Sequence, residues 1–306
     1  MKSFYPPLFV LLALFILSCS GDMEKDKVRI GFSQALSGHP YRDAMNRSMQ
    51  LQASLNPDIE LSIYEANGDI EKQKGHLQQM IQEQFDAIII SPLNPVKVVP
   101  EVDQAYDLGI PMIIVDRKVA TDRYTAFVGA DNLEVGKNAG NFITSYSNED
   151  INVIEIRGSD NSSPVRERSE GFHSIVDNQK NINIIASIKG EDSGTPRSRL
   201  STILDSLKAK KIDFIYAFND EMAYQAWEVS RTKGLEKQIK FIGVDGLNVE
   251  NGGIELVRNG ILEASILYPT GGGEALQLAI KSIEKKPVDK ANILATTIID
   301  RFNADI

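Results

Sequence analysis

The sequence predicts an α/β protein made of two doubly wound lobes, each with a parallel β-sheet between layers of helices. From Val28 onward, short apolar segments alternate with amphipathic segments, many of ten or more residues. This alternation is typical of parallel sheets that are covered on both faces. The 306-residue chain holds more such strands than one compact domain of this kind needs. No short repeat of fixed period is present, which argues against a solenoid.

The first 27 residues are expected to form an export signal and a tether. The apolar run at 8–17 is too short to span a bilayer as a helix and fits a secretory signal. The sequence ILSC, at 16–19, resembles the bacterial lipoprotein signal, in which the cysteine carries the lipid. We expect a signal peptide over 1–18 and a tether over 19–27, lipidated at Cys19. The alternative is an ordinary signal peptide with an incidental cysteine.

The elements that follow are predicted from hydrophobic periodicity and from residues that end helices. Leu77 and Ile81, four residues apart, give the second helix an apolar stripe. Gly109 and Pro111 end the third helix. The expected strands are 28–34, 59–67, 85–92 and 111–117, and the expected helices are 41–55, 70–84 and 98–109.

The same alternation repeats in the second half of the chain. The expected helices are 132–147, 163–178, 197–210, 221–234 and 253–260, and the expected strands are 151–158, 181–190, 212–220, 239–246 and 261–269. Gly271–Gly273 open the last long helix. We expect one lobe to comprise 28–130 plus 269–294, and the other to comprise 131–268 plus 295–306.

The composition argues against several classes of function. A net charge of −9 disfavours sequence-independent binding to nucleic acid, which needs a basic surface. Cys19 is the only cysteine, so the chain forms no internal disulfide. Three histidines without a cysteine–histidine cluster give no zinc signal. We therefore expect no nucleic-acid partner, no metal and no cofactor.

Polar side chains end several predicted strands. Asp116 and Arg117 follow a buried strand, and Gln34, Asn219 and Asp245 end others. In doubly wound sheets, ligands bind outside the carboxyl ends of the strands. A carboxylate accepts hydrogen bonds and a guanidinium donates them, so a neighbouring pair suits adjacent hydroxyl groups. Each residue alone could cap a helix or turn the chain, but together they favour hydroxyl recognition.

Four segments resemble the ribose-binding type of periplasmic sugar-binding protein. They are MIIVDRKV at 112–119, PVRERSEGFHS at 164–174, AFNDEMAYQA at 217–226 and FIGVDG at 241–246. The resemblance extends from Val28 to about Ile299. It implies the type I periplasmic-binding-protein fold, with two Rossmann-like lobes joined by three crossovers and closing on a sugar. YPTGG, at 268–272, resembles the periplasmic sensor domains of hybrid two-component systems in gut Bacteroidetes, some of which resemble fructose-binding domains.

The resemblance also implies the site. It places one stacking aromatic at Tyr41, whereas Arg42 occupies the position of a second. The family's asparagine falls on Asn219, and Tyr268 replaces a glutamine. Its charged residues fall on Asp116, Arg117, Arg168 and Asp245. A second-lobe aromatic would fall near Asp192, and His39 belongs either to the site or to a turn. We expect Arg42 to narrow the choice of sugar, unless it lies on the outer face of its helix.

We therefore predict an exported, non-enzymatic monosaccharide binder, with ribose or fructose as the first candidates. It would serve an ABC permease or a sensor histidine kinase, as a periplasmic lipoprotein anchored to the membrane. The alternative is a sugar- or nucleotide-modifying enzyme on the same fold, although no P-loop, dinucleotide fingerprint or nucleophile elbow is present. A DNA-binding regulator would need a helix-turn-helix where the export signal stands. The chain is either a stand-alone binding protein or the front of a longer one.

Overall fold

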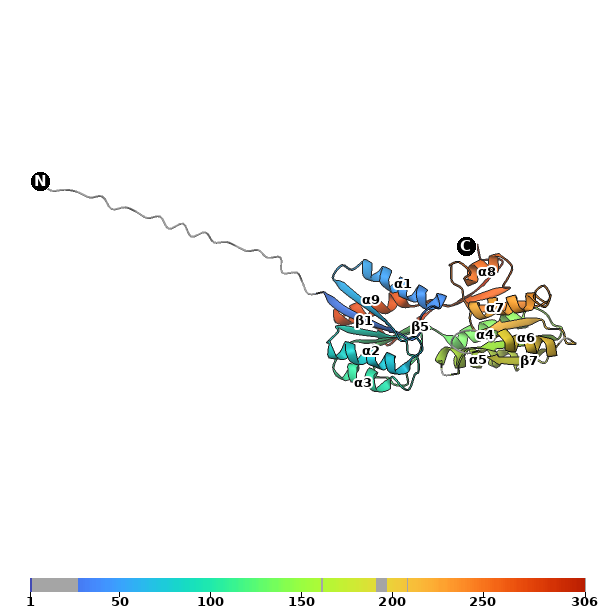
Figure 1. Cartoon of the computed structure of the whole chain (residues 1–306), viewed down its shortest axis with the longest axis horizontal. Helices are drawn as coiled ribbons and strands as arrows, with labels where there is room; N and C mark the ends of the chain where they lie inside the picture. The colour runs from blue at the N-terminus through green and yellow to red at the C-terminus, as the bar shows by residue number, and fades with distance from the viewer. Residues whose placement is uncertain (2–26, 161, 191–196, 208, 306) are drawn as a thin grey trace.

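The chain folds into two α/β lobes, each built on its own six-stranded sheet within the described residues (Figure 1). The computed structural model describes Met1 and residues 27–305, apart from residues 161, 191–196 and 208. Cys19 and Asp192 lie outside the described residues. No helix in the described part of the chain is both long and apolar enough to cross a bilayer.

The sheet of the first lobe is parallel throughout, in the order β11-β5-β4-β3-β1-β2. Every residue of β3 and β4 is buried and apolar, because helices cover both faces. Helices α1 and α9 pack together on one face, and α2 and α3 pack on the other (Figure 1). The strands are β1 (Val28–Gln34), β2 (Ile59–Glu65), β3 (Ala87–Ile90), β4 (Met112–Val115), β5 (Ala126–Ala130) and β11 (Ala291–Leu294). The helices are α1 (Pro40–Ser54), α2 (Ile70–Gln82), α3 (Val99–Asp107) and α9 (Gly272–Ile283).

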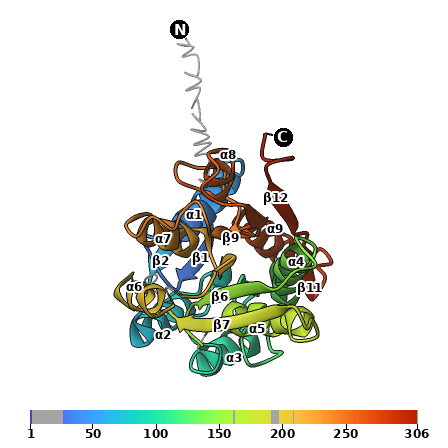
Figure 2. The same ribbon diagram turned by 90° about the vertical axis from the view of Figure 1, so that its right-hand side faces the viewer.

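The second lobe repeats this arrangement, in the order β12-β10-β9-β8-β6-β7. Helices α4 and α5 cover one face of its sheet, and α6, α7 and α8 cover the other (Figure 2). The strands are β6 (Ile151–Arg157), β7 (Ile182–Lys189), β8 (Phe214–Ala217), β9 (Lys240–Asp245), β10 (Ala264–Leu267) and β12 (Thr297–Asp300). The helices are α4 (Asn132–Thr144), α5 (Ser163–Val176), α6 (Arg197–Ser206), α7 (Asp220–Arg231) and α8 (Gly253–Arg258).

Three strands were not among the predicted elements. The chain passes between the sheets after β5, after β10 and after β11, and the added strands β5, β11 and β12 border two of these crossovers. Strand β12 runs antiparallel to β10, so the second sheet has one antiparallel edge. Strands β11 and β12 have four residues each, and much of their surface is exposed. Their hydrophobic pattern is therefore weak, and they depend on pairing with a distant neighbour.

Glycines bring α4 and α5 into backbone contact. A Cβ atom at Gly136 would lie 2.1 Å from the carbonyl oxygen of Arg168, and one at Gly171 would lie 2.1 Å from the carbonyl oxygen of Leu133. Only glycine permits this approach. The close packing fixes the position of α5, and with it the Arg168 side chain at the lobe interface.

Candidate ligand-binding cleft

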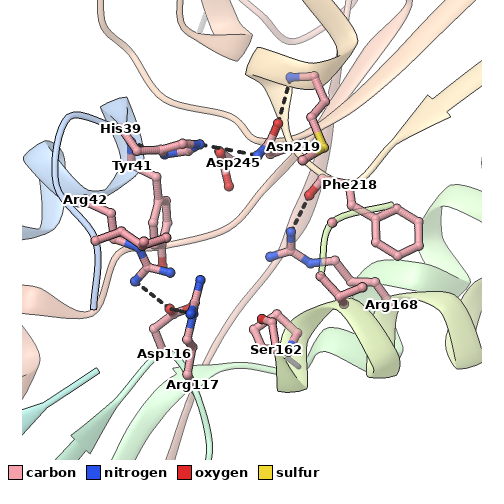
Figure 3. Close-up of a pocket in the computed structure, with 15 residues that line it drawn as sticks. His39, Tyr41, Arg42, Asp116, Arg117, Ser162, Arg168, Phe218, Asn219 and Asp245 are labelled. Carbon is pink, nitrogen blue, oxygen red and sulfur yellow. Dashed lines mark hydrogen bonds and ion pairs between the residues drawn. The ribbon is translucent and has the colours of Figure 1, made fainter. Parts of the chain in front are cut away.

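A cavity between the lobes collects most of the predicted site residues. It lies at the carboxyl ends of the strands, where both sheets face each other (Figure 3). Of the predicted residues, those that line it are His39, Tyr41, Arg42, Asp116, Arg117, Arg168, Asn219 and Asp245. Tyr268 lies behind this lining, and Asp192 is outside the described residues.

Asp116 is the centre of the first lobe's contribution. Its carboxylate accepts a 2.7 Å hydrogen bond from Nη1 of Arg42 and lies 3.9 Å from Nε of Arg117. Arg42 also donates to the Ser91 hydroxyl at 3.1 Å, so it points into the cleft and not to the outer face of α1. Burial alone would raise the pKa of Asp116, but Arg42 and Arg117 hold that pKa below its usual value. Asp116 is therefore an ionised acceptor in a buried site.

The two aspartates occupy equivalent places in the two lobes. Asp116 follows β4 and Asp245 ends β9, and these strands hold the same position in their sheets. The backbone φ is 65° at Asp116 and 125° at Asp245. Positive φ is uncommon for residues other than glycine and is often retained at functional sites. Both lobes thus use a strained strand end to turn a carboxylate toward the cleft.

Arg168 is held from two sides in the second lobe. Its Nε donates to Oδ1 of Asn132 at 2.9 Å, and its Nη1 donates to the carbonyl oxygen of Phe218. The guanidinium also lies 4.6 Å from the ring centre of Tyr268. Asn132 in turn donates to the Tyr268 hydroxyl at 3.0 Å. Tyr268 therefore supports Arg168 from behind.

The Asp245 carboxylate faces the cavity. It is 6% exposed and makes no hydrogen bond to any residue that the structure describes. Burial raises the pKa of Asp245 well above its usual value, and repulsion from Asp220 raises that pKa further, against the attraction of Arg168. A buried carboxylate is costly without donors, and hydroxyl groups of a ligand would supply them.

Tyr41 contributes the aromatic surface of the first lobe. Its hydroxyl donates to the carbonyl oxygen of Pro269 at 3.2 Å, and its ring centre lies 5.7 Å from that of Tyr268. The ring lines the cavity although only 4% of the residue is exposed. An aromatic face in this place can cover the C–H groups of a sugar ring.

His39 joins the two lobes across the cleft. Its Nδ1 accepts from the Tyr41 N–H at 3.2 Å, so it caps α1, and its Nε2 therefore carries the proton of the neutral ring. That Nε2 lies 3.2 Å from a carboxylate oxygen of Glu221 in the second lobe. Burial, Arg42 and Arg117 lower the pKa of His39 to about 4. The imidazole is thus neutral at pH 7.

A second contact between the lobes lies at the rim. Nζ of Lys118 is 2.8 Å from the Glu167 carboxylate, and the Lys118 N–H donates to the Ser163 hydroxyl at 3.0 Å. Asn219, which caps α7 by accepting from the Met222 N–H at 2.7 Å, also places Nδ2 3.3 Å from Nε2 of His39. The lobes are therefore closed on the cavity.

Two residues at or beside the cleft escaped prediction from the sequence. Asn132 follows β5, and because that strand was not predicted, its polar end was not considered as a site. Phe218 lines the cavity directly before Asn219, but an apolar residue at a strand end gives no signal that separates it from the core. The polar residue directly after β5 is Asp131, which caps α4, so the strand-end signal leads to this neighbour and not to Asn132 itself.

Two similar α/β lobes that close on a cleft lined by charged, amide and aromatic side chains define a two-lobe solute-binding protein. Residues 30–287 match the family described as periplasmic binding protein domain, and the chain belongs to this family. The family's members are solute-binding proteins and not enzymes, and the family places the chain in the periplasm.

Among curated relatives, the chain is 27% identical to the ribose import binding protein of Bacillus subtilis, covering 74% of this chain and 72% of the relative. It is 30% identical to the galactofuranose-binding protein of Escherichia coli, over 71% of each. Among solved structures, the fructose-binding periplasmic domain of the hybrid two-component system BT1754 is 35% identical, with a TM-score of 0.83, covering 90% of this chain and 92% of that one. These relatives act in sugar transport or sensing.

Proposed function

We propose that the protein binds a neutral monosaccharide of the ribose or fructose kind between its lobes, for uptake or for sensing. The observation that carries this proposal is the pair of equivalent aspartates, Asp116 and Asp245, turned into one closed cleft beside Arg42 and Arg168. Carboxylates accept and guanidinium groups donate, so the cleft matches both hydrogen-bonding directions of a hydroxyl group. Each well-made bond to a charged group contributes about 1.5–3 kcal/mol.

The balance of buried charge supports a neutral ligand. The cleft and the layer directly behind it hold as many carboxylates as guanidinium groups, all at most 7% exposed. Burial raises the pKa values of Asp220 and Asp245 and so favours their neutral forms, and hydroxyl groups that donate to Asp245 shift it back toward its ionised form. The guanidinium groups belong to Arg42, Arg117 and Arg168, and the carboxylates to Asp116, Asp220 and Asp245.

The names of the relatives guide the choice of sugars. The domain that is 35% identical is named as fructose-binding, and curated relatives carry the names of ribose and galactofuranose binders. Isothermal titration calorimetry with D-fructose, D-ribose and L-arabinose, beside gluconate and fructose 6-phosphate, tests the proposal. A neutral sugar should bind with a Kd of roughly 1 μM or lower, or about −8 kcal/mol. Tighter binding of a charged ligand, or no binding of any sugar, would contradict it.

We also propose that Cys19 anchors the protein to the membrane by a lipid. The proposal rests on the ILSC sequence directly after the apolar run. Metabolic labelling with a radioactive fatty acid should mark the wild-type protein, and Cys19→Ser should remove the label and release the protein into the soluble periplasmic fraction. An unlabelled wild-type protein would show that the segment is an ordinary signal peptide.

A further inference from the structure

A third buried aspartate, Asp220, lies behind the cleft and ties three elements together. Its carboxylate accepts from the Gly246 N–H at 2.7 Å and from the Ser265 hydroxyl at 2.6 Å. Asp220 begins α7, Gly246 follows β9, and Ser265 belongs to β10. Asp220 is 4% exposed and Ser265 is fully buried. One side chain therefore links the start of a helix to two neighbouring strands, beside the cleft residue Asn219.

The lobe is built around this carboxylate. A Cβ atom at Gly243 would lie 2.1 Å from Oδ1 of Asp220, and one at Gly253 would lie 2.1 Å from Oδ2. Neither glycine has a positive φ, so each is needed for space and not for its backbone conformation. The two glycines make room for a carboxylate that does not line the cavity.

The group that Asp220 holds is the strained turn at the end of β9. Asp245 has a φ of 125° and Gly246 a φ of 60°. An aspartate rarely adopts such a φ unless its surroundings fix it. The bond from the Gly246 N–H to Asp220 is short and involves a carboxylate, which makes it stronger than a neutral one.

We propose that Asp220 is a positioning residue, which holds the Asp245–Gly246 turn so that the Asp245 carboxylate faces the sugar. This inference rests on the proposed function, because it assigns Asp245 to the ligand. Asp220 does not line the cavity, and it acts through the backbone of its neighbour.

The two carboxylates also interact electrostatically. Burial raises the pKa of Asp220 to about 7, against its bonds from Ser265 and Gly246 and the attraction of Arg168. The charged groups that face Asp245 are Asp220 from α7, Arg168 from α5, Arg42 from α1 and Asp116 from the end of β4. In the folded protein Asp220 keeps its proton up to about pH 7, whereas in the unfolded chain it releases this proton near its ordinary pKa of 3.8. Ionisation of Asp220 therefore lowers the free energy of unfolding as pH rises through this window.

Calorimetry with D-fructose tests the positioning role in Asp220→Ala and in Asp220→Asn. The alanine variant should bind at least tenfold more weakly than wild type. The asparagine variant should stay within about threefold, since its amide oxygen can accept from Gly246 and its amide nitrogen can donate to Ser265. In a protein that already carries Asp245→Asn, adding Asp220→Ala should weaken sugar binding by less than a further twofold, because the residue that Asp220 positions is already altered.

The results that overturn the inference are distinct from those that overturn the proposed function. The inference is wrong if Asp220→Ala and Asp220→Asn bind sugar equally well. It is also wrong if Asp220→Ala weakens binding as much in the Asp245→Asn background as in wild type, because Asp220 would then not act through Asp245. No binding of any sugar by wild type would instead overturn the proposed function. If Asp220→Ala does not fold, Ser265→Ala is tested in its place. Ser265→Ala should lower sugar affinity twofold to fivefold in wild type and not at all in the Asp245→Asn background. Unchanged affinity in Ser265→Ala would contradict the inference.

A measurement without sugar completes the test. The melting temperature of Asp220→Asn relative to wild type should rise between pH 5 and pH 8, because the variant lacks the buried Asp220 carboxyl whose ionisation is costly in the folded wild type. His39 titrates in both proteins and cancels in the difference. A difference that does not change with pH would show that the pKa of Asp220 is not raised into this range.

Discussion

Asp116 shows how single residues make the cleft. It is 3% exposed and paired with Arg42 at 2.7 Å, and the positive φ at its own backbone turns it inward. Its partners are Arg42, which is 74 positions away in the sequence, and the adjacent Arg117. Removing one member of a buried pair leaves the other as an uncompensated charge, which costs about 3–5 kcal/mol.

Asp116→Ala should therefore weaken sugar binding a hundredfold or more while the lobes stay folded. Asp116→Asn is the matched control, because asparagine tolerates a positive φ and keeps one acceptor oxygen; it should lose less affinity than alanine does. Calorimetry measures both, and circular dichroism checks the fold. A folded alanine variant within threefold of wild type would remove Asp116 from the site.

Arg42 is the residue that should set the choice of sugar. A guanidinium meets an oxygen in a fixed place, whereas a ring stacks on any sugar face. Arg42→Phe should weaken the preferred sugar and reduce the affinity ratio between that sugar and its competitors. Arg42→Lys keeps the charge but not the planar fork, and should lose affinity as well. Unchanged affinity and an unchanged ratio in Arg42→Phe would contradict this role.

At the scale of elements, the contact between α4 and α5 positions the second lobe's arginine. Gly136 lies against the carbonyl of Arg168, and Asn132 at the start of α4 accepts from the same residue's Nε. Helix propensity alone would favour alanine over glycine by up to about 1 kcal/mol. The backbone contact reverses this preference, because a Cβ atom would force the helices apart.

Gly136→Ala should lower the melting temperature and weaken sugar binding, since Arg168 moves with α5. Gly75→Ala, at an exposed position of α2, is the matched control: its Cβ would meet no atom within 4 Å. That substitution should raise stability by about 0.5–1 kcal/mol and leave affinity unchanged. Similar effects of the two substitutions on stability would contradict the account of this packing.

The sequence was informative where local pattern and function coincide. Asp116, Asn219 and Asp245 could be placed in one cleft because parallel strands end at the same edge of a sheet. The edge strands β11 and β12 could not be predicted, since their four residues gain their stability from a distant partner. Pairing of Arg42 with Asp116, and the role of Asp220 behind Asp245, depend on rotamers and on neighbours far along the chain.

At the scale of the whole molecule, closure buries His39 against Glu221 of the second lobe, whereas Arg42 and Arg117 lie beside it in its own lobe. Burial is the largest cause that lowers the pKa of His39 to about 4, so opening should raise this pKa toward its ordinary value of 6.5. The closed form thus binds the proton more weakly, so acid favours opening. Sugar affinity should fall as pH drops below 6.5, by at most about tenfold at pH 5.5.

His39→Gln should lose this part of the pH dependence, and any remainder belongs to the pair formed by Asp220 and Asp245. Calorimetry from pH 5.5 to pH 8 in wild type and variant measures it. If the variant keeps the full pH dependence of the wild type, His39 is not the group that titrates on closure.

The most direct test of the central claim is a crystal structure of the protein with the sugar that binds best in calorimetry. We predict the sugar between the closed lobes, with its ring against Tyr41 and its hydroxyl groups bonded to Asp116, Arg168 and Asp245. A sugar bound outside this cleft, or one inside it without contact to either aspartate, would contradict the account.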